Sequence, residues 1–160
     1  MNPIFERLAE NPRIFRRLVN LWFPYLGAGI HVEKIRPDWR RIDVRMRLRW
    51  YNRNYMGTHF GGSLFAMTDP FFVLMLIKNL GKDYWVWDID ARVRFIAPGR
   101  GTVRARFALS EAVVEQIRLA AAAGQKVLQT FTARVFDEKG ICVAEVEKTI
   151  YIRRKKHRSS

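Results

Sequence analysis

One stretch of the chain, residues 54–81, is hydrophobic nearly all round. A helix without a polar stripe has to be covered by other elements, so this stretch predicts a helix at the centre of the core. On both sides of it apolar and polar positions alternate, as they do in strands with one buried and one solvated face. The predicted strands lie near residues 30–36, 41–50, 84–97, 102–115, 126–137 and 141–153.

The beginning of the chain has a helical pattern instead. Residues 3–10 and 12–23 predict two short helices, because Asn11 and Pro12 supply an N-cap and a first-turn proline. The second helix is amphipathic, which favours packing on the domain and leaves a membrane-surface or lid role as the alternative. Pro24 is expected to close this helix.

Together these elements predict an α+β domain in which a curved, mainly antiparallel sheet wraps around the long central helix. Any part of the helix that the sheet leaves uncovered would form a large apolar patch, so we expect self-association. The domain organisation predicted from the pattern is an N-terminal helical segment (1–27), the sheet-and-helix domain (28–153) and a basic C-terminal tail (154–160).

The composition suits a single globular domain with a basic surface. The 160 residues include 49% hydrophobic ones and carry a formal net charge of +14, which predicts attraction to polyanions or phosphorylated ligands. Such a charge would attract nucleic acid, an anionic membrane surface or a nucleotide-bearing cofactor. A basic face that only aids solubility is the alternative explanation. The single cysteine, Cys142, and the lack of a secretion signal pattern predict a cytoplasmic protein, and the scattered histidines predict no metal site.

Most of the side chains opposite the apolar strand positions are basic. In the strand at 41–50, the alternate positions from Ile42 to Trp50 are expected to face the core. The outer face of the sheet is then rich in arginine, and Glu145 and Glu147 neutralise part of it. The arginines in this pattern are Arg45, Arg47, Arg49, Arg92, Arg94, Arg104 and Arg106.

Asp69 is the only carboxylate in the central apolar stretch. A carboxylate buried without partners is costly, which favours a functional role, although the Asp69-Pro70 pair is also typical of a helix N-cap. Eight residues earlier, Gly61 and Gly62 have backbone N–H groups unshielded by a Cβ atom, which suit an oxyanion hole. Close helix packing is the alternative explanation for this pair.

These residues resemble the hotdog-fold thioesterases, in particular acyl-CoA thioesterases of the phenylacetate pathway, and also an uncharacterised branch of that superfamily. The matching order and spacing belong to Asn54, Gly57, Gly61, Gly62 and Asp69. The segment DIDARVRFIAPGRG at residues 88–101 looks like the strand that follows the helix in that family, and the resemblance covers roughly residues 28–153.

The resemblance implies a hotdog fold and hydrolysis of an acyl-CoA thioester, with coenzyme A present only as part of the substrate and no separate cofactor. It implies that Asp69 acts as general base or nucleophile, and that the Gly61 and Gly62 amides form the oxyanion hole. Asn54 would hold the attacking water or orient Asp69 across a subunit boundary. A dimer, or a dimer of dimers, would therefore form the site.

Two positions depart from that family's pattern. Phe60 stands directly before the glycine pair, where the family usually has histidine, and His59 lies one place earlier. Pro70 follows Asp69 and removes a helical hydrogen bond, so we expect a kink there.

The candidates for substrate binding are His59, Phe60, Phe72, Asp88 and Arg100. Phe72 suits an acyl chamber, although core packing explains it equally well, and His59 has a structural role as its alternative. Arg100 lies in a Pro-Gly-Arg-Gly turn, and both this residue and the basic segment 153–158 suit the phosphates of coenzyme A. The alternative for that segment is a solvated chain end.

Asp88 is expected to share one strand face with Asp90. If that face is inward, the two carboxylates approach Asp69; if it is outward, they pair with arginines. The outward placement is favoured, because Arg92 and Arg94 continue the same alternation.

Two other functions stay open at this stage. One is a non-catalytic hotdog module that binds acyl-CoA, lipid or another polyanion through its basic surface, with nucleic acid as the less favoured partner. The other is a dehydratase or hydratase of the same superfamily, for which His59 is poorly placed.

Overall fold

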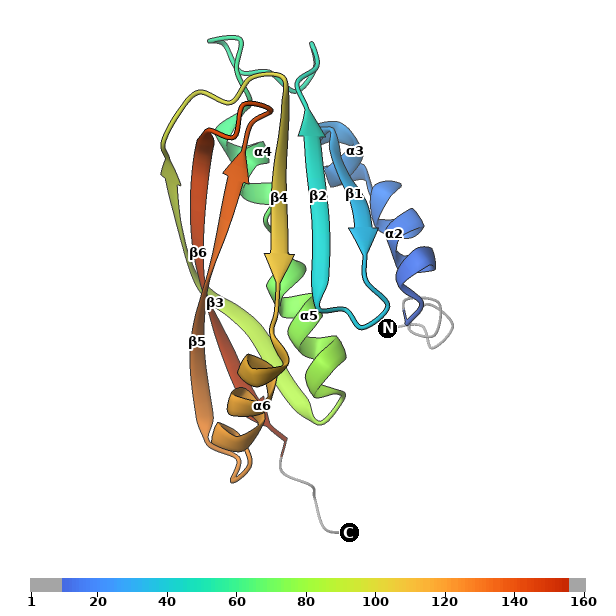
Figure 1. Cartoon of the computed structure of the whole chain (residues 1–160), viewed down its shortest axis with the longest axis vertical. Helices are drawn as coiled ribbons and strands as arrows, with labels where there is room; N and C mark the ends of the chain where they lie inside the picture. The colour runs from blue at the N-terminus through green and yellow to red at the C-terminus, as the bar shows by residue number, and fades with distance from the viewer. Residues whose placement is uncertain (1–9, 156–160) are drawn as a thin grey trace.

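The computed structural model describes residues 10–155. It shows one curved sheet with two helices in its concave face and further helices at its margins (Figure 1). The helix predicted for residues 3–10 and the end of the basic segment lie outside the described residues. The elements are α2 (Pro12–Asn20), α3 (Phe23–Ala28), β1 (Ile30–Ile35), β2 (Arg41–Arg47), α4 (Gly61–Ala66), α5 (Phe71–Leu80), β3 (Tyr84–Phe95), β4 (Thr102–Ala108), α6 (Glu111–Ala120), β5 (Lys126–Phe136) and β6 (Cys142–Arg154).

The six-stranded sheet has the order β1-β2-β4-β5-β6-β3, and all its pairs are antiparallel. The sheet curves around α4 and α5, so the predicted α+β hotdog architecture is confirmed (Figure 1). In this order β1 and β3 are the two edge strands, although they are separated in the chain by the central helices.

Aromatic side chains hold α5 against the inner face of the sheet. Phe71 and Phe72 of α5 both pack against Phe107 of β4, with ring centroids 4.9 and 5.3 Å away. Phe131 of β5 stacks on Phe72 at 4.7 Å. Such pairs add aromatic contact energy to the burial of their area, so this cluster fixes α5 within the sheet.

The predicted central helix is two helices. α4 ends at Ala66 and α5 begins at Phe71, and the peptide bond between Asp69 and Pro70 is cis. Because Pro70 occupies the N-cap position of α5 and no side chain caps that helix, the N-cap alternative for Asp69 is wrong. The stretch 61–80 is long and apolar enough to cross a membrane by length and composition alone, and half of it is buried inside the fold.

Two strand predictions need correction. The chain after Ala108 forms α6 rather than the end of a strand, because Ser110 accepts a hydrogen bond from the Val113 N–H at 3.3 Å and caps a helix. β2 ends at Arg47, so Trp50 is exposed and does not continue the core face of that strand.

The N-terminal prediction is right about α2 and wrong about its end. α2 stops at Asn20, and Pro24 lies in the first turn of a separate helix, α3, because proline fits the start of a helix better than its interior. Tyr25 of α3 is buried in the main core, so this segment packs on the domain.

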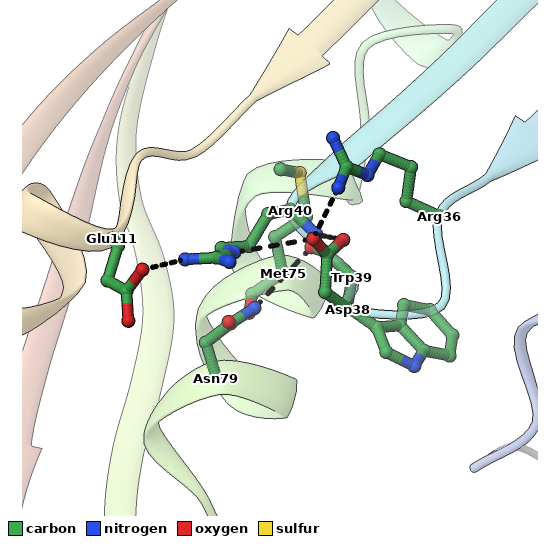
Figure 2. A network of polar contacts seen from close by, with 7 residues as sticks. All are labelled: Arg36, Asp38, Trp39, Arg40, Met75, Asn79 and Glu111. Atoms are coloured by element: carbon green, nitrogen blue, oxygen red, sulfur yellow. Dashed lines mark hydrogen bonds and ion pairs between the residues drawn. The ribbon is translucent and has the colours of Figure 1, made fainter.

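A polar network ties the turn between β1 and β2 to both α5 and α6 (Figure 2). Asp38 accepts from the Arg40 backbone N–H at 3.0 Å, and the Arg40 side chain reaches Glu111 at 2.9 Å. Asn79 of α5 donates to the Trp39 carbonyl at 3.4 Å. The network therefore joins the β1 side of the sheet to the helices beneath it.

Replacing Asn11 by alanine is expected to lower the free energy of unfolding by about 1 kcal/mol. The Asn11 side chain accepts from the Arg13 and Ile14 N–H groups at 2.9 and 3.4 Å, which alanine leaves without that partner. Urea denaturation measures the change, and Asn11→Ser, which keeps an acceptor, should lose less than half as much. An unchanged midpoint in Asn11→Ala would contradict the capping role.

Candidate active site

A buried lysine joins two carboxylates at the break between α4 and α5. The Lys148 side chain, on β6, is only 4% exposed; its Nζ contacts the Asp69 carboxylate and lies 2.9 Å from Asp88 Oδ2. The Asp69 side chain is 48% exposed and that of Asp88 28% exposed. One cation thus holds two carboxylates that both reach solvent.

The strand register explains how these groups meet. Lys148 lies between the buried residues Val146 and Ile150, which are two positions away on either side and therefore share its face of β6. Ile150 is opposite Asp88, whereas a register shift in β3 separates Asp88 from Asp90. The bulge turns Asp88 toward the helices and leaves Asp90 on the other face.

The expectation that Asp88 and Asp90 share a face is therefore wrong. The favoured outward placement holds for Asp90, which continues into the positions of Arg92 and Arg94, and fails for Asp88. An extra residue in one strand reverses the alternation beyond it, and the apolar-polar pattern does not reveal such a residue.

The backbone at Asp69 is fixed by groups on other elements. The Tyr25 hydroxyl of α3 donates to the Asp69 carbonyl, and the Asp69 N–H donates to the Ala66 carbonyl at 3.1 Å. Burial, with a smaller contribution from the Asp69 charge, raises the pKa of Tyr25, so this hydroxyl keeps its proton. The carboxylate of Asp69 is presented from a constrained segment rather than from a free loop.

The glycine pair at the start of α4 allows two phenylalanine rings to approach the backbone. A Cβ atom at Gly61 would lie 2.9 Å from the Phe95 ring, and one at Gly62 would lie 2.4 Å from the Phe60 ring. A side chain at either position would therefore require one of these exposed rings to move. The first N–H groups of a helix also lack acceptors within it, so the packing role does not use up these donors.

A hollow of about 570 Å³ lies beside Gly61, and part of the predicted site lines it. Its lining includes Asn54, His59, Gly61 and Arg100. Neither Asp69 nor Asp88 lines it. Within one chain, six of the predicted residues thus fall into two groups: Asn54, His59, Gly61 and Arg100 line this hollow, and Asp69 and Asp88 meet at Lys148.

The Asn54 side chain is hydrogen-bonded within its own loop. Its amide Nδ2 donates to Thr58 Oγ1 at 2.9 Å and to the His59 carbonyl at 3.2 Å, and its Oδ1 accepts from the Thr58 N–H at 3.1 Å. These bonds shape the segment that leads into α4. In a single chain Asn54 positions the approach to Gly61 and does not contact Asp69.

His59 is a buried side chain directed at the turn between β3 and β4. Its Nε2 lies 3.1 Å from the Gly101 carbonyl, so Nε2 carries a proton, and its Nδ1 has no hydrogen-bond partner among the described residues. Burial lowers the pKa of His59, and the bond to Gly101 opposes this in part. The neutral imidazole is the form that fits this environment.

The lowered pKa of His59 makes stability depend on pH. The unfolded chain binds a proton near pH 6.5 while the folded chain resists it, so the unfolding free energy should fall as the pH drops below about 6.5. The slope is expected to be no steeper than about 1.4 kcal/mol per pH unit for one proton. Urea denaturation between about pH 8 and 5 measures it, and His59→Gln should flatten the slope.

His31 is the control for this prediction, because its pKa is also lowered, by burial and by the nearby Arg45 and Arg16. His31→Gln should remove only the part of the pH dependence of the unfolding free energy that His31 itself contributes. A slope that stays unchanged in His59→Gln would show that His59 is not held neutral in the fold.

The remaining predicted residues lie in different surroundings. Phe72 is buried in the aromatic core, the alternative that was left open for it, while Phe60 is exposed over Gly62 and Arg100 is exposed on its turn. Within residues 10–155, no three His, Cys, Asp or Glu side chains gather closely enough to hold a metal ion.

Lys148 is the site residue that the sequence analysis missed. The signal was present, because a lysine occupies a core position between Val146 and Ile150 in an otherwise apolar alternation. A single charge on the buried face of a strand requires partners there, and only the folded sheet shows which carboxylates supply them.

The outer face of the sheet is rich in arginine, as expected, but more of its charge is neutralised than predicted. Arg94 and Arg134 both pair with Glu145, at 3.2 and 2.7 Å. Arg106 pairs with Asp43 of β2 at 2.7 Å, so this carboxylate also neutralises part of the arginine charge. Exposed pairs of this kind contribute little to stability, and the face stays basic.

The family model described as a domain of unknown function, DUF4442, matches residues 11–152. The chain belongs to the DUF4442 family. No curated protein matches the sequence of this DUF4442 protein. Its family model therefore covers α2 to β6, including every residue of both groups described above.

Solved structures share the fold of the DUF4442 protein at low sequence identity. PA5026 of Pseudomonas aeruginosa, described as a protein of unknown function and probable thioesterase, is 21% identical with a TM-score of 0.76, over 89% of this chain and 95% of that one. The thioesterase HI1161 of Haemophilus influenzae is 14% identical with a TM-score of 0.65, over 94% and 95%. The likeness identifies the fold as that of hotdog thioesterase structures.

Proposed function

We propose that this DUF4442 protein hydrolyses the thioester bond of an acyl-CoA. The observation that carries the proposal is a half-exposed carboxylate, Asp69, held by the buried Lys148 at the end of a helix that begins with two glycines. The fold shared with proteins described as thioesterases supports the same reaction class.

The chemistry needs one carboxylate oxygen directed at the substrate. Lys148 binds Oδ1 of Asp69, so Oδ2 is the oxygen available to attack the thioester carbonyl or to take a proton from an attacking water. If Asp69 attacks, an acyl-aspartyl anhydride forms as the carbon–sulfur bond breaks, and water then hydrolyses that anhydride to the free acid and restores the carboxylate. If water attacks, its oxygen bonds to the carbonyl carbon, Asp69 takes its proton, and the carbon–sulfur bond breaks. In both routes the departing sulfur takes up a proton that comes from the water, and coenzyme A leaves as the thiol. The Asp88 carboxylate fixes Lys148 from its other side at 2.9 Å.

In the proposed enzyme the oxyanion donors come from a second chain. Gly61 opens α4, whereas Asp69 lies beyond the other end of that helix and does not line the hollow at Gly61, so the two do not act on one carbonyl group within a single chain. β3 lies beside both of them: the Phe95 ring packs on Gly61, and Asp88 joins Asp69 through Lys148.

A second copy of the chain would bring the two groups together by pairing along β3. β3 is an edge strand, and unpaired strand edges favour pairing with another strand. An antiparallel pair of β3 strands centred near Ala91 sets Asp88 of one subunit opposite the region of Phe95 in the other. Asp69 would then face Gly61 and Asn54 of the partner subunit, and Arg100 beside that hollow would meet the phosphates of coenzyme A.

The proposal is tested by release of free thiol from short, long and aromatic acyl-CoAs. Saturable hydrolysis of at least one class is expected. A binding-only hotdog module is the second candidate, because the Asn54 amide is already bonded within its own loop. Saturable acyl-CoA binding without thiol release from any of the panel would favour that module over the hydrolase.

Mixing two inactive variants tests the shared site. Asp69→Asn and Gly61→Ala each damage a different half, so a mixed dimer keeps one intact site if the halves come from different subunits. Random exchange then restores about a quarter of the wild-type activity. No recovery in mixtures shown to contain mixed dimers would place both groups in the same subunit.

A further inference from the structure

One corner of the molecule exposes apolar side chains that the core does not use. Phe23 is 85% exposed and Trp50 is 80% exposed, although both are large and hydrophobic. They belong to two segments, the junction of α2 with α3 and the loop after β2. We call the following residues the apolar corner: Leu21, Trp22, Phe23, Leu26, Trp50 and Tyr51.

Asn52 holds these two segments together. Its Nδ2 donates to the Ala28 carbonyl at the end of α3, at 2.9 Å, and to the Arg47 carbonyl at the end of β2, at 2.8 Å. α3 is only six residues long, about 9 Å from end to end, so Phe23 and the loop after β2 stay close. In Figure 1, α3 and the loop after β2 lie at the same end of the molecule.

The two segments that build the apolar corner contain no acidic residue. Residues 11–32 and 44–68 include neither Asp nor Glu. Every charged side chain they carry is an arginine: Arg13, Arg16, Arg17, Arg45, Arg47, Arg49 and Arg53. The corner is thus surrounded by positive charge alone from its own segments.

A basic hollow of about 160 Å³ lies next to Tyr51 of the apolar corner. It is lined by Gly29, His31, Arg45, Arg47, Arg49 and Tyr51. Arg45 also pairs with Glu33 at 3.4 Å, which offsets one of the three guanidinium charges. A hollow of this size suits a single phosphate group rather than a larger ligand.

We propose that the apolar corner docks on a membrane surface rich in anionic phospholipid, with a headgroup phosphate in the basic hollow. Tryptophan and tyrosine rings prefer the headgroup level, and the leucine and phenylalanine side chains enter the acyl region beneath it. Arginines around such a surface add electrostatic attraction to anionic lipid. Exposed apolar groups on segments whose charged side chains are all arginines match this partner in both respects.

Nucleic acid fits the same features less well. A single strand is bound along a basic groove, with successive bases stacked on aromatic rings. Here one small hollow lies beside projecting side chains, and three of the six corner residues are aliphatic or phenylalanine groups that lack a hydrogen-bonding edge. A lipid surface uses those side chains, whereas a nucleic acid leaves them in water.

The apolar corner is also separate from the proposed active site. α3 packs beside β1, while β3 is the opposite edge of the sheet. Pairing through β3 would therefore leave the corner open. Membrane docking does not depend on thioester hydrolysis, and either proposal can fail without the other.

The test is flotation of the full-length protein with vesicles of phosphatidylcholine alone and with phosphatidylglycerol added. Binding is expected only with phosphatidylglycerol and should weaken as salt is raised. Arg47→Glu combined with Arg49→Glu should weaken it at least about 30-fold, since each basic side chain near such a surface contributes about fivefold and reversal adds repulsion. Phe23→Ser combined with Trp50→Ser should weaken it by at least about tenfold.

Lys82→Glu combined with Lys126→Glu is the matched control, because it makes the same charge change just after α5 and at the start of β5. The end of α5 and the helix α6 that precedes β5 lie at the opposite end of the molecule from α3 (Figure 1). This control should alter binding by less than about threefold, and circular dichroism checks that each variant is folded. Equal loss in this control, or unchanged binding in the Phe23 and Trp50 variant, overturns the proposal. Tighter binding to a single-stranded oligonucleotide than to vesicles, lost in the same arginine variant, overturns it in favour of nucleic acid.

Discussion

Asp69→Asn is expected to reduce thiol release from acyl-CoA by about 10²–10⁴-fold while the protein stays folded. Asparagine has the size of aspartate and can still accept a hydrogen bond from Lys148. Its amide neither attacks a carbonyl carbon nor takes a proton from water, so the chemistry is lost and the shape is kept. The measurement is kcat/KM with the best substrate of the acyl-CoA panel.

Asp90→Asn is the matched control for this prediction. Asp90 lies on the same strand as Asp88 but on the opposite face, beyond the bulge in β3. Its replacement should leave kcat/KM within about twofold, because it removes the same charge from outside the cluster. Wild-type turnover in Asp69→Asn would remove Asp69 from the mechanism, whatever the control does.

The proposed dimer offers a second test of the role of Asp69. If Asp69 acts on a carbonyl group held by Gly61 of the partner subunit, each site needs both chains, and dilution below the dimer dissociation constant should remove activity from the wild type as well. Loss on dilution would then resemble the mutant phenotype without any change of residue. Activity that is constant down to the monomer would separate hydrolysis from pairing through β3.

The sheet could be predicted from the sequence because the alternation of apolar and polar residues is a local property of each strand. Strands β1, β5 and β6 follow alternations that a curved sheet with one buried face requires, and the apolar stretch before β3 could only be its central helical layer. The apolar residues of the stretch identified the layer. They did not identify the break between Ala66, where α4 ends, and Phe71, where α5 begins after Pro70.

Helix α6 shows the opposite case. Val113, Val114 and Ile117 are residues that favour strands, and part of this segment was assigned to the strand predicted at 102–115. The deciding contact is the Ser110 cap, and the helix is held because Val114 and Ile117 pack in the core. Local preference was overruled by tertiary packing, which a pattern along the chain does not contain.

Some residues of the candidate site could likewise be predicted from the sequence, and others could not. Asp69, Gly61 and Asn54 could be singled out by residue type and spacing, since each is unusual for its position in an apolar stretch. Lys148 and the inward turn of Asp88 depend on which strands are neighbours and on one bulge. Both are properties of the sheet order, so they appear only when the chain is folded.

Lys148→Met is expected to lower both stability and turnover. Methionine has a similar length and no charge, so the change leaves two carboxylates near each other without their shared cation. Breaking a fully buried pair costs about 3–5 kcal/mol, but Asp69 and Asp88 are 48% and 28% exposed. We therefore expect a loss of about 1–3 kcal/mol in unfolding free energy, measured by urea denaturation.

The kinetic effect of Lys148→Met should appear in kcat rather than in KM. Asp69 would lose the contact that fixes Oδ1, so its other oxygen is directed less well at the thioester, and kcat should fall at least about tenfold. The double variant Lys148→Met with Asp88→Asn removes the repulsion between the carboxylates. It should regain more than half of the lost stability while kcat stays low, because Asp69 still lacks its cation. Recovery of kcat together with stability would show that Lys148 only supports the fold.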